Sequence, residues 1–303
     1  MTRRTRILIG VVLVVAVAAL AFAFGPRGPD ADPTAEPHLG AAPEPAVPEP
    51  TPEPGAPRSP APRDPTPVES PATPEPDDDT RYGWYYIANS SHDAPGVPAE
   101  ASRLLAAYGG IYTGPDPGAV YLTVDQGYEN GNTPAILDAL ARNGVKATFF
   151  VTRSYVVNNP DLVRRMADEG HVVGNHTSTH PSLPGIATDQ ATFAEELEST
   201  ERAYEEVTGR SMAPIMRPPM GEYSARALWL TQQLGYTSVF WGFAHRDWVV
   251  DDQPPVDVTI SRILGGSHPG AIYLLHGVSS SDTQALDAAI EGLRAQGYDF
   301  GVL

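Results

Sequence analysis

The chain has 303 residues, a formal net charge of −17 and no cysteine. The absence of thiols excludes a disulfide scaffold, a cysteine nucleophile and a zinc ion held by cysteine. The acidic balance excludes a nucleic-acid partner, because contacts to phosphates require a basic face. The composition shifts twice along the chain, which predicts three parts: residues 1–25, residues 26–80 and a folded domain at residues 81–303.

The first part carries three arginines followed by an uncharged apolar run of 18 residues, from Ile7 to Phe24. This length is at the lower end of what spans a bilayer as a helix. The preceding arginines place the N-terminus in the cytoplasm. Two interpretations remain open: a retained transmembrane helix, or a signal peptide cleaved near Ala21-Phe-Ala23. Either one exports the rest of the chain, as a single-pass protein of the cell membrane facing the cell wall space or as a secreted one.

The second part, residues 26–80, has roughly one proline in every three residues, together with alanine, glutamate and threonine. Such a segment buries too little apolar surface to offset its chain entropy, so we expect a disordered, Pro-rich linker. Its Pro-Glu-Pro units favour extended polyproline II. The linker is either a spacer that gives an anchored domain reach, or low-complexity sequence with no such requirement.

In the third part, short apolar runs alternate with longer amphipathic segments from Ala119 onward, behind an expected N-terminal arm at residues 82–118. Strands separated by helices pair in parallel, and about seven such steps predict an α/β fold, an incomplete (distorted) β/α barrel. The sequence contains no Walker loop and no GxGxxG after a strand, so no nucleotide partner is indicated. The expected strands are 119–124, 147–151, 171–174, 215–217, 237–241, 271–275 and 298–302, and the expected helices are 133–144, 159–170, 188–209, 224–235 and 283–296.

Polar side chains recur where the expected strands end, which is the edge of a barrel that carries its chemistry. They are Asp125, His176, Arg217, Asp247 and His276. Taken singly, each also has a structural interpretation, such as a turn aspartate, a surface arginine or a hydrogen-bonded core histidine. Their joint placement at one end of one sheet favours a functional site.

One pair of histidines has the spacing of metal ligands. His176 and His180 enclose three residues, and two imidazoles at this spacing can share one metal ion, although the pattern alone is weak. Pro181 follows His180 and disfavours a continuing helix. The pair is therefore expected on a loop at a strand end, where the metal interpretation is stronger.

Five ordered motifs give the folded part a family resemblance. They are Thr123-Val-Asp-Gln-Gly127, His176-x-x-x-His180, Arg217-Pro-Pro219, Asp247-Trp248 and Leu274-Leu-His276. In order and spacing they resemble those of the polysaccharide deacetylases, the NodB-homology group of carbohydrate esterase family 4. The stretch from Asp125 to Gly131, Asp-Gln-Gly-Tyr-Glu-Asn-Gly, is most similar to the delta-lactam-biosynthetic (muramic acid) peptidoglycan de-N-acetylases.

The resemblance implies a role for each catalytic position. His176 and His180 would hold a divalent metal, Zn2+, which activates water, and Asp125 would be the general base. Arg217 would orient Asp125 and keep it ionised. His276 would donate a proton to the leaving amine, with Asp247 orienting it and raising its pKa. The wider family has aspartate as a third ligand where this chain has Gln126, so we expect Gln126 to ligate loosely or through water, with weaker metal binding.

The resemblance also implies a substrate groove. Its expected contacts are Trp248, Tyr128, Glu129, Asn130, Met220 and Leu274. The backbone N–H of Met220 would also support the oxyanion, and this residue stands where the family commonly has tyrosine. A further departure is Ala244, where the family's fuller motif begins with a second acid. Because Asp247 is retained, we expect little harm to the proton donor.

Together these features predict a monomeric hydrolase of carbon–nitrogen bonds other than peptide bonds, acting on peptidoglycan glycan strands. The expected reaction is metal-dependent removal of the N-acetyl group of an amino sugar, N-acetylmuramic acid, with release of acetate. Two alternatives stay open: a deacetylase of N-acetylglucosamine polymers, and a wall-glycan-binding module with weakened catalysis.

Overall fold

The computed structural model describes residues 74–89 and 91–303, so the apolar run at 7–24 and nearly all of the predicted linker lie outside the described residues. Within the described ranges, no helix has both the length and the apolar character needed to cross a bilayer. Contacts with helix α7 (Ala225–Gln233) already begin at Glu75, which pairs with Arg226 at 2.6 Å. Asp79 also accepts a hydrogen bond from the Ser224 hydroxyl, so these contacts start before residue 81.

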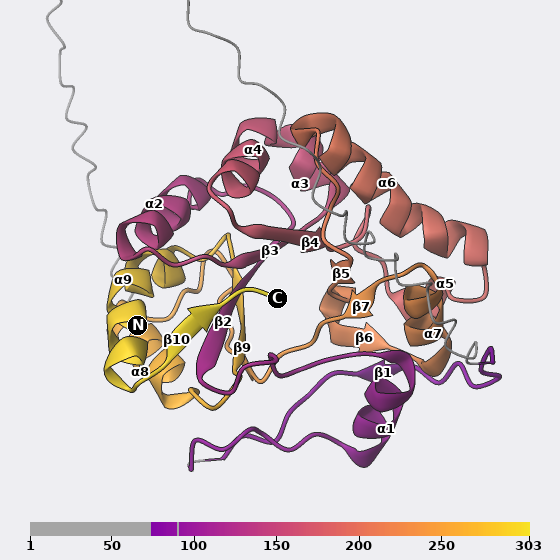
Figure 1. Cartoon of the computed structure of the whole chain (residues 1–303), viewed down its shortest axis with the longest axis horizontal. Coiled ribbons are helices and arrows are strands. Elements are labelled where there is room, and N and C mark those ends of the chain that lie inside the picture. Colours follow the sequence, from indigo (N-terminus) through magenta and orange to yellow (C-terminus); the bar gives the residue numbers. More distant parts are fainter. Residues whose placement is uncertain (1–73, 90) are drawn as a thin grey trace, which may run out of the picture. The chain divides into compact units, whose positions relative to one another are not determined.

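A curled parallel sheet organises the described domain, with seven strands in the order β7-β5-β4-β3-β2-β9-β8. Helices lie around the strands (Figure 1). This confirms the expected α/β half-barrel of about seven parallel strands. An additional strand, β10 (Asp299–Gly301), pairs in parallel with the first residues of β2. The seven strands are β2 (Ala119–Gln126), β3 (Thr148–Val151), β4 (Val172–Asn175), β5 (Ile215–Met216), β7 (Thr237–Ser238), β8 (Phe243–Ala244) and β9 (Ile272–His276).

The arm before β2 packs on the barrel, as expected. Its helix α1 (Ala99–Tyr108) shares an aromatic cluster with α7, and strand β1 (Tyr82–Gly83) pairs antiparallel with β6 (Glu222–Tyr223). The segment at 111–114 then runs between β7 and the start of β9. Its backbone donates hydrogen bonds to carbonyls of both flanks, Ile111 N to Ser238 O at 2.9 Å and Gly114 N to Gly270 O at 2.8 Å.

The helices begin and end largely where their capping residues indicate. Helix α2 ends at Gly144, whose φ of 62° is the left-handed conformation that glycine adopts readily. The Ser224 hydroxyl accepts from Ala227 N at 3.1 Å and starts α7. Several elements were not predicted, among them α3, α5, α8 and β8. The helices on the barrel are α2 (Thr133–Asn143), α3 (Arg153–Asn158), α4 (Pro160–Asp168), α5 (Leu183–Ile186), α6 (Gln190–Thr208), α8 (Val256–Gly265) and α9 (Ser280–Ala295).

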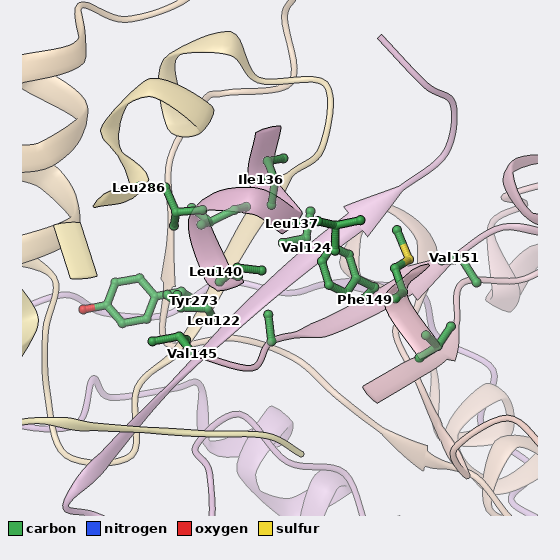
Figure 2. Packing of buried hydrophobic residues seen from close by; sticks show 14 of the residues in the cluster. Leu122, Val124, Ile136, Leu137, Leu140, Val145, Phe149, Val151, Tyr273 and Leu286 are labelled. Atoms are coloured by element: carbon green, nitrogen blue, oxygen red, sulfur yellow. The ribbon is translucent and has the colours of Figure 1, made fainter. Parts of the chain in front are cut away.

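The central strand β2 is buried along its whole length, so both of its faces carry apolar side chains. Leu122 and Val124 belong to the large core cluster that packs against α2 and α9, where Leu137 is fully buried (Figure 2). Tyr121 belongs to a second cluster, inside the barrel. Because side chains alternate along a strand, Asp125 lies on the inner face with Tyr121. Gln126 lies on the helix-facing side with Val124.

Candidate active site

A groove of about 820 Å³ opens at the carboxyl ends of the strands. Residues from five predicted motifs meet in it, because parallel strands deliver their last residues to one edge. Asp125 and His276 are register partners on the adjacent strands β2 and β9. The predicted site residues that line the groove are Asp125, Tyr128, His176, His180, Met220, Trp248, Leu274 and His276.

Asp125 is held by a buried arginine beneath the groove. Arg217 Nη1 lies 2.7 Å from Asp125 Oδ1, and the guanidinium is fully buried, 4.3 Å above the ring of Phe150. Arg217 Nε donates a further hydrogen bond to the carbonyl of Val239. This pairing leaves the second carboxylate oxygen of Asp125 on the side of His176, whose Nε2 lies 3.6 Å away. Arg217 therefore fixes which oxygen of Asp125 faces the histidine.

The two histidines lie on a loop after β4, as predicted, and that loop is tightly specified. Thr177 and His180 both adopt positive φ, 67° and 60°, which is costly for residues other than glycine. The Asn175 side chain accepts from Thr177 N, and the Thr177 hydroxyl accepts from His180 N. The Glu196 carboxylate accepts from the backbone amides of Ser178 and Thr179. These bonds fix the His176 and His180 rings with their centroids 4.8 Å apart.

The donor set of this loop fits a divalent transition metal such as zinc. His176 Nδ1 bonds to the carbonyl of Arg217 at 2.9 Å, which fixes the tautomer and leaves Nε2 free to ligate. Burial lowers the pKa of His176 to about 4 and also lowers that of His180, so both imidazoles are neutral, as ligands must be. Imidazole nitrogens are ligands that zinc commonly takes, and the free oxygen of Asp125 faces them, 3.6 Å from His176 Nε2.

The structure places Gln126 outside the groove, contrary to the expectation that it ligates the metal. Its side chain is fully buried on the helix-facing side of β2, and its Nε2 donates to the Thr133 hydroxyl at 3.1 Å. Thr133 is in turn bonded to Glu129 and Tyr155, which holds the amide in place. A Cβ at Gly277 would lie 2.2 Å from this amide, so a larger residue there would displace the Gln126 side chain. The alternation of the strand explains the difference.

His276 and Asp247 are hydrogen-bonded to each other, which is the pairing that the sequence predicted. Asp247 follows β8 and is fully buried. Its two oxygens accept hydrogen bonds from His276 Nδ1 and from the His276 backbone N–H, both at 2.7 Å. Burial by itself would lower the pKa of His276. The hydrogen bond and charge of Asp247, with the charge of Asp125, outweigh burial and raise that pKa. Trp248 stands beside the imidazole, 5.6 Å between ring centroids, and is half-exposed.

The predicted substrate contacts divide into two groups. Tyr128, Met220 and Trp248 are exposed on the groove wall, and Leu274 contributes a buried part of that wall. Glu129 and Asn130, in contrast, do not line the groove: they stabilise the turn before α2. The Glu129 carboxylate binds the Thr133 and Tyr155 hydroxyls, and Asn130 Nδ2 donates to the carbonyl of Val278 at 3.2 Å.

Two buried residues near Asp247 were not predicted as site residues, His245 and Asp282. His245 Nε2 lies 2.9 Å from Asp282 Oδ1, and both side chains are buried. In the sequence, His245-x-Asp247 was available as a signal, but Asp282 lies in a Ser-rich stretch typical of a helix N-terminus. Each of His245, Asp247 and Asp282 offers a ligand atom within 4.8 Å of the others, yet both oxygens of Asp247 already serve His276.

Comparison with known proteins identifies the family. Residues 113–239 match the family model "Polysaccharide deacetylase". The chain is 40% identical over 218 residues to the peptidoglycan-N-acetylmuramic acid deacetylase PdaA of Bacillus subtilis, covering 72% of this chain and 82% of that protein. It is also 40% identical over 158 residues to a chitooligosaccharide deacetylase of Bradyrhizobium, covering 52% of this chain and 70% of that protein.

The fold agrees with this assignment. The solved structure of Bacillus subtilis PdaA, a family 4 carbohydrate esterase, superposes with a TM-score of 0.71 at 38% identity, covering 74% of this chain and 95% of that one. On these similarities the chain belongs to the polysaccharide deacetylases of carbohydrate esterase family 4, the NodB-homology hydrolases that cleave amide carbon–nitrogen bonds.

Proposed function

We propose that this enzyme removes the N-acetyl group of N-acetylmuramic acid in peptidoglycan and releases acetate. The observation that carries the proposal is the placement of a carboxylate, Asp125, and an imidazole, His276, in register on neighbouring strands at one groove. The similarity to PdaA and the stretch from Asp125 to Gly131 support the muramic acid substrate. The half-exposed Trp248 and Tyr128 offer flat apolar surfaces to a sugar ring.

The chemistry assigned to the side chains follows from their contacts. Asp125, with one oxygen fixed by Arg217, accepts the proton of the attacking water through its other oxygen. An amine leaves an amide only when it is protonated. His276 gives its Nδ1–H to Asp247, so the transferable proton is the one on Nε2. Asp125 on β2 thus activates the water that attacks the carbonyl carbon, and His276 on the adjacent strand β9 protonates the nitrogen of the same amide bond.

We further propose that His176 and His180 hold a zinc ion, with the Asp125 oxygen beside them. When bound, the ion supplies a positive charge that activates water and polarises the acetamide carbonyl. Because Gln126 is turned toward Thr133, this chain itself provides fewer charged ligands than the wider family. We expect correspondingly weak metal affinity.

The substrate assignment is tested by acetate release from two purified glycans, one offering N-acetylmuramic acid and the other a polymer of N-acetylglucosamine. We expect release from the first, loss of that release after chelation, and its recovery when zinc is restored. Release from the second alone would favour the alternative activity, which the chitooligosaccharide deacetylase similarity supports. Release from neither glycan in the zinc-loaded protein would contradict both assignments.

The proposed site of action is the wall space outside the cytoplasmic membrane, because the predicted apolar run precedes the domain. Immunoblotting of membrane and medium fractions, with antibody against the domain, tests this. Full-length protein in the membrane fraction identifies a retained anchor, and a shortened form in the medium identifies a cleaved signal peptide. A protein found only in the cytoplasm would contradict the proposal.

A further inference from the structure

Helix α6 carries a carboxylate, Glu196, that binds the loop with the two histidines without lining the groove. Its Oε2 accepts hydrogen bonds from the backbone N–H groups of Ser178 at 2.9 Å and Thr179 at 2.8 Å. Its Oε1 accepts from the Thr179 hydroxyl at 2.7 Å. The arginine of the same helix, Arg202, pairs instead with Glu195. In the described part of the chain, the side-chain hydrogen bonds of Glu196 therefore all come from this loop.

The loop needs such a support because its backbone is strained. Thr177 and His180 both adopt positive φ, and non-glycine residues remain in that conformation only where the surrounding contacts over-determine it. Ser178 and Thr179 lie between these two positions, and they are the residues whose amides Glu196 accepts. The carboxylate thus holds the middle of the turn that carries one metal-binding histidine at each end.

Helix α6 gives Glu196 a fixed position relative to the sheet. Leu197, the next residue, is fully buried in a cluster that also contains Met216 of β5. The Leu197 carbonyl accepts a hydrogen bond from the buried Asn175 side chain at 2.9 Å. Asn175 ends β4 and directly precedes His176. The helix is therefore attached to the strand end before the loop, and through Glu196 to the loop itself.

We propose that Glu196 is a positioning residue for the zinc site: its hold on the loop keeps the His176 and His180 imidazoles arranged to bind before the ion arrives. The inference rests on the proposed zinc site. A site that is only partly arranged loses apparent affinity in proportion to the fraction of molecules that are ready to bind. Without the Glu196 contacts the strained loop relaxes, that fraction falls, and the zinc dissociation constant rises.

Two substitutions of Glu196 separate its geometry from its charge. Glu196→Gln keeps the length of the side chain: its amide oxygen accepts the two backbone N–H groups, and its amide nitrogen donates to the Thr179 hydroxyl. Glu196→Asp keeps the negative charge but is one methylene shorter, so it cannot make the same set of hydrogen bonds. Glu195→Gln and Glu195→Asp are the matched controls, because Glu195 is the adjacent acid of the same helix, is exposed and pairs with Arg202.

The measurement is the zinc dissociation constant of the full chain in detergent, determined by competition with a chromogenic chelator. We expect Glu196→Asp to raise this constant at least about tenfold, equivalent to the loss of one hydrogen bond to a charged group. Glu196→Gln and both Glu195 variants should stay within about threefold of the unchanged protein. An unchanged constant in Glu196→Asp would overturn the proposal. So would a Glu196→Gln that binds zinc as weakly as Glu196→Asp, because charge and not geometry would then set the affinity.

Hydrogen exchange of the metal-free protein tests the hold on the loop without zinc. The Ser178 and Thr179 amides should exchange faster in Glu196→Asp than in Glu196→Gln, and at the unchanged rate in the Glu195 variants. Equal exchange in all of these proteins would overturn the proposal. Thermal unfolding verifies that each variant is folded. If Glu196→Asp does not fold, the affinity of Glu196→Gln still decides, since a loss of about tenfold there would contradict a geometric role.

His180→Ala separates this inference from the proposed function, because it removes a proposed ligand and should abolish zinc binding. Zinc bound at full affinity by His180→Ala would refute the proposed metal site, and the inference with it. Zinc lost in His180→Ala but bound at full affinity by Glu196→Asp would leave the proposed function intact and refute the role of Glu196 alone.

Discussion

Asp125→Asn is expected to lower kcat for acetate release by about a thousandfold, because the asparagine amide cannot accept the proton of the attacking water. The change also leaves the fully buried Arg217 without its counter-charge, which costs on the order of 3–5 kcal/mol of stability. Activity is therefore measured well below the thermal midpoint of the variant, and initial rates are normalised to folded protein by circular dichroism.

Two control variants separate the loss of the base from the loss of stability. Leu137→Ala opens a cavity in the core away from the groove and costs about 2–5 kcal/mol, yet it should retain kcat. Asp161→Asn removes an exposed carboxylate on α4 and should change neither stability nor rate appreciably. If Leu137→Ala loses as much kcat as Asp125→Asn, the loss reflects stability and Asp125 is not the base.

His276→Gln is expected to lower kcat by about a hundredfold or more and to remove the alkaline limb of the pH–rate profile. The sign follows from the raised pKa of His276: the imidazole is protonated and able to donate below that pKa, and activity is lost as the pH rises through it. Asp247→Asn removes the group that opposes burial, so burial prevails and the pKa of His276 falls. The alkaline limb of Asp247→Asn should therefore move to lower pH.

The measurement is kcat/KM against pH for the three proteins with zinc in constant excess, so that loss of metal at low pH is not mistaken for titration of the acid. An alkaline limb that persists unchanged in His276→Gln would assign it to another group. A limb that moves to higher pH in Asp247→Asn would contradict the assignment of Asp247 as the residue that holds the proton on His276.

Much of the fold followed from local signals. The left-handed glycine at 144 and the serine cap at 224 mark helix boundaries, and the apolar runs at 119–124 and 271–275 are central strands of the parallel sheet. The missed elements gave weaker signals. Helix α8 begins after Pro255 without a side-chain cap, and β8 has only two residues. Neither length nor periodicity distinguishes such pieces from a loop.

The site was predictable to the extent that it depends on strand ends, and less so where it depends on side-chain direction. Asp125, His176 and His276 meet in one groove because they end or follow parallel strands. Gln126 was assigned to the same groove from the family resemblance, but strand alternation turns it toward Thr133. Asp282 lies near Asp247 and His245 only through the tertiary packing of α9, which no motif in the sequence encodes.

The most direct test of the central claim is anomalous diffraction at the zinc edge from crystals of the zinc-loaded protein. One anomalous peak between the imidazoles of His176 and His180, beside the carboxylate of Asp125, is the predicted result. A peak enclosed by His245, Asp247 and Asp282, with none at the two histidines, would contradict the claim, because the cation would then lie among buried side chains behind the proton donor and not at the groove.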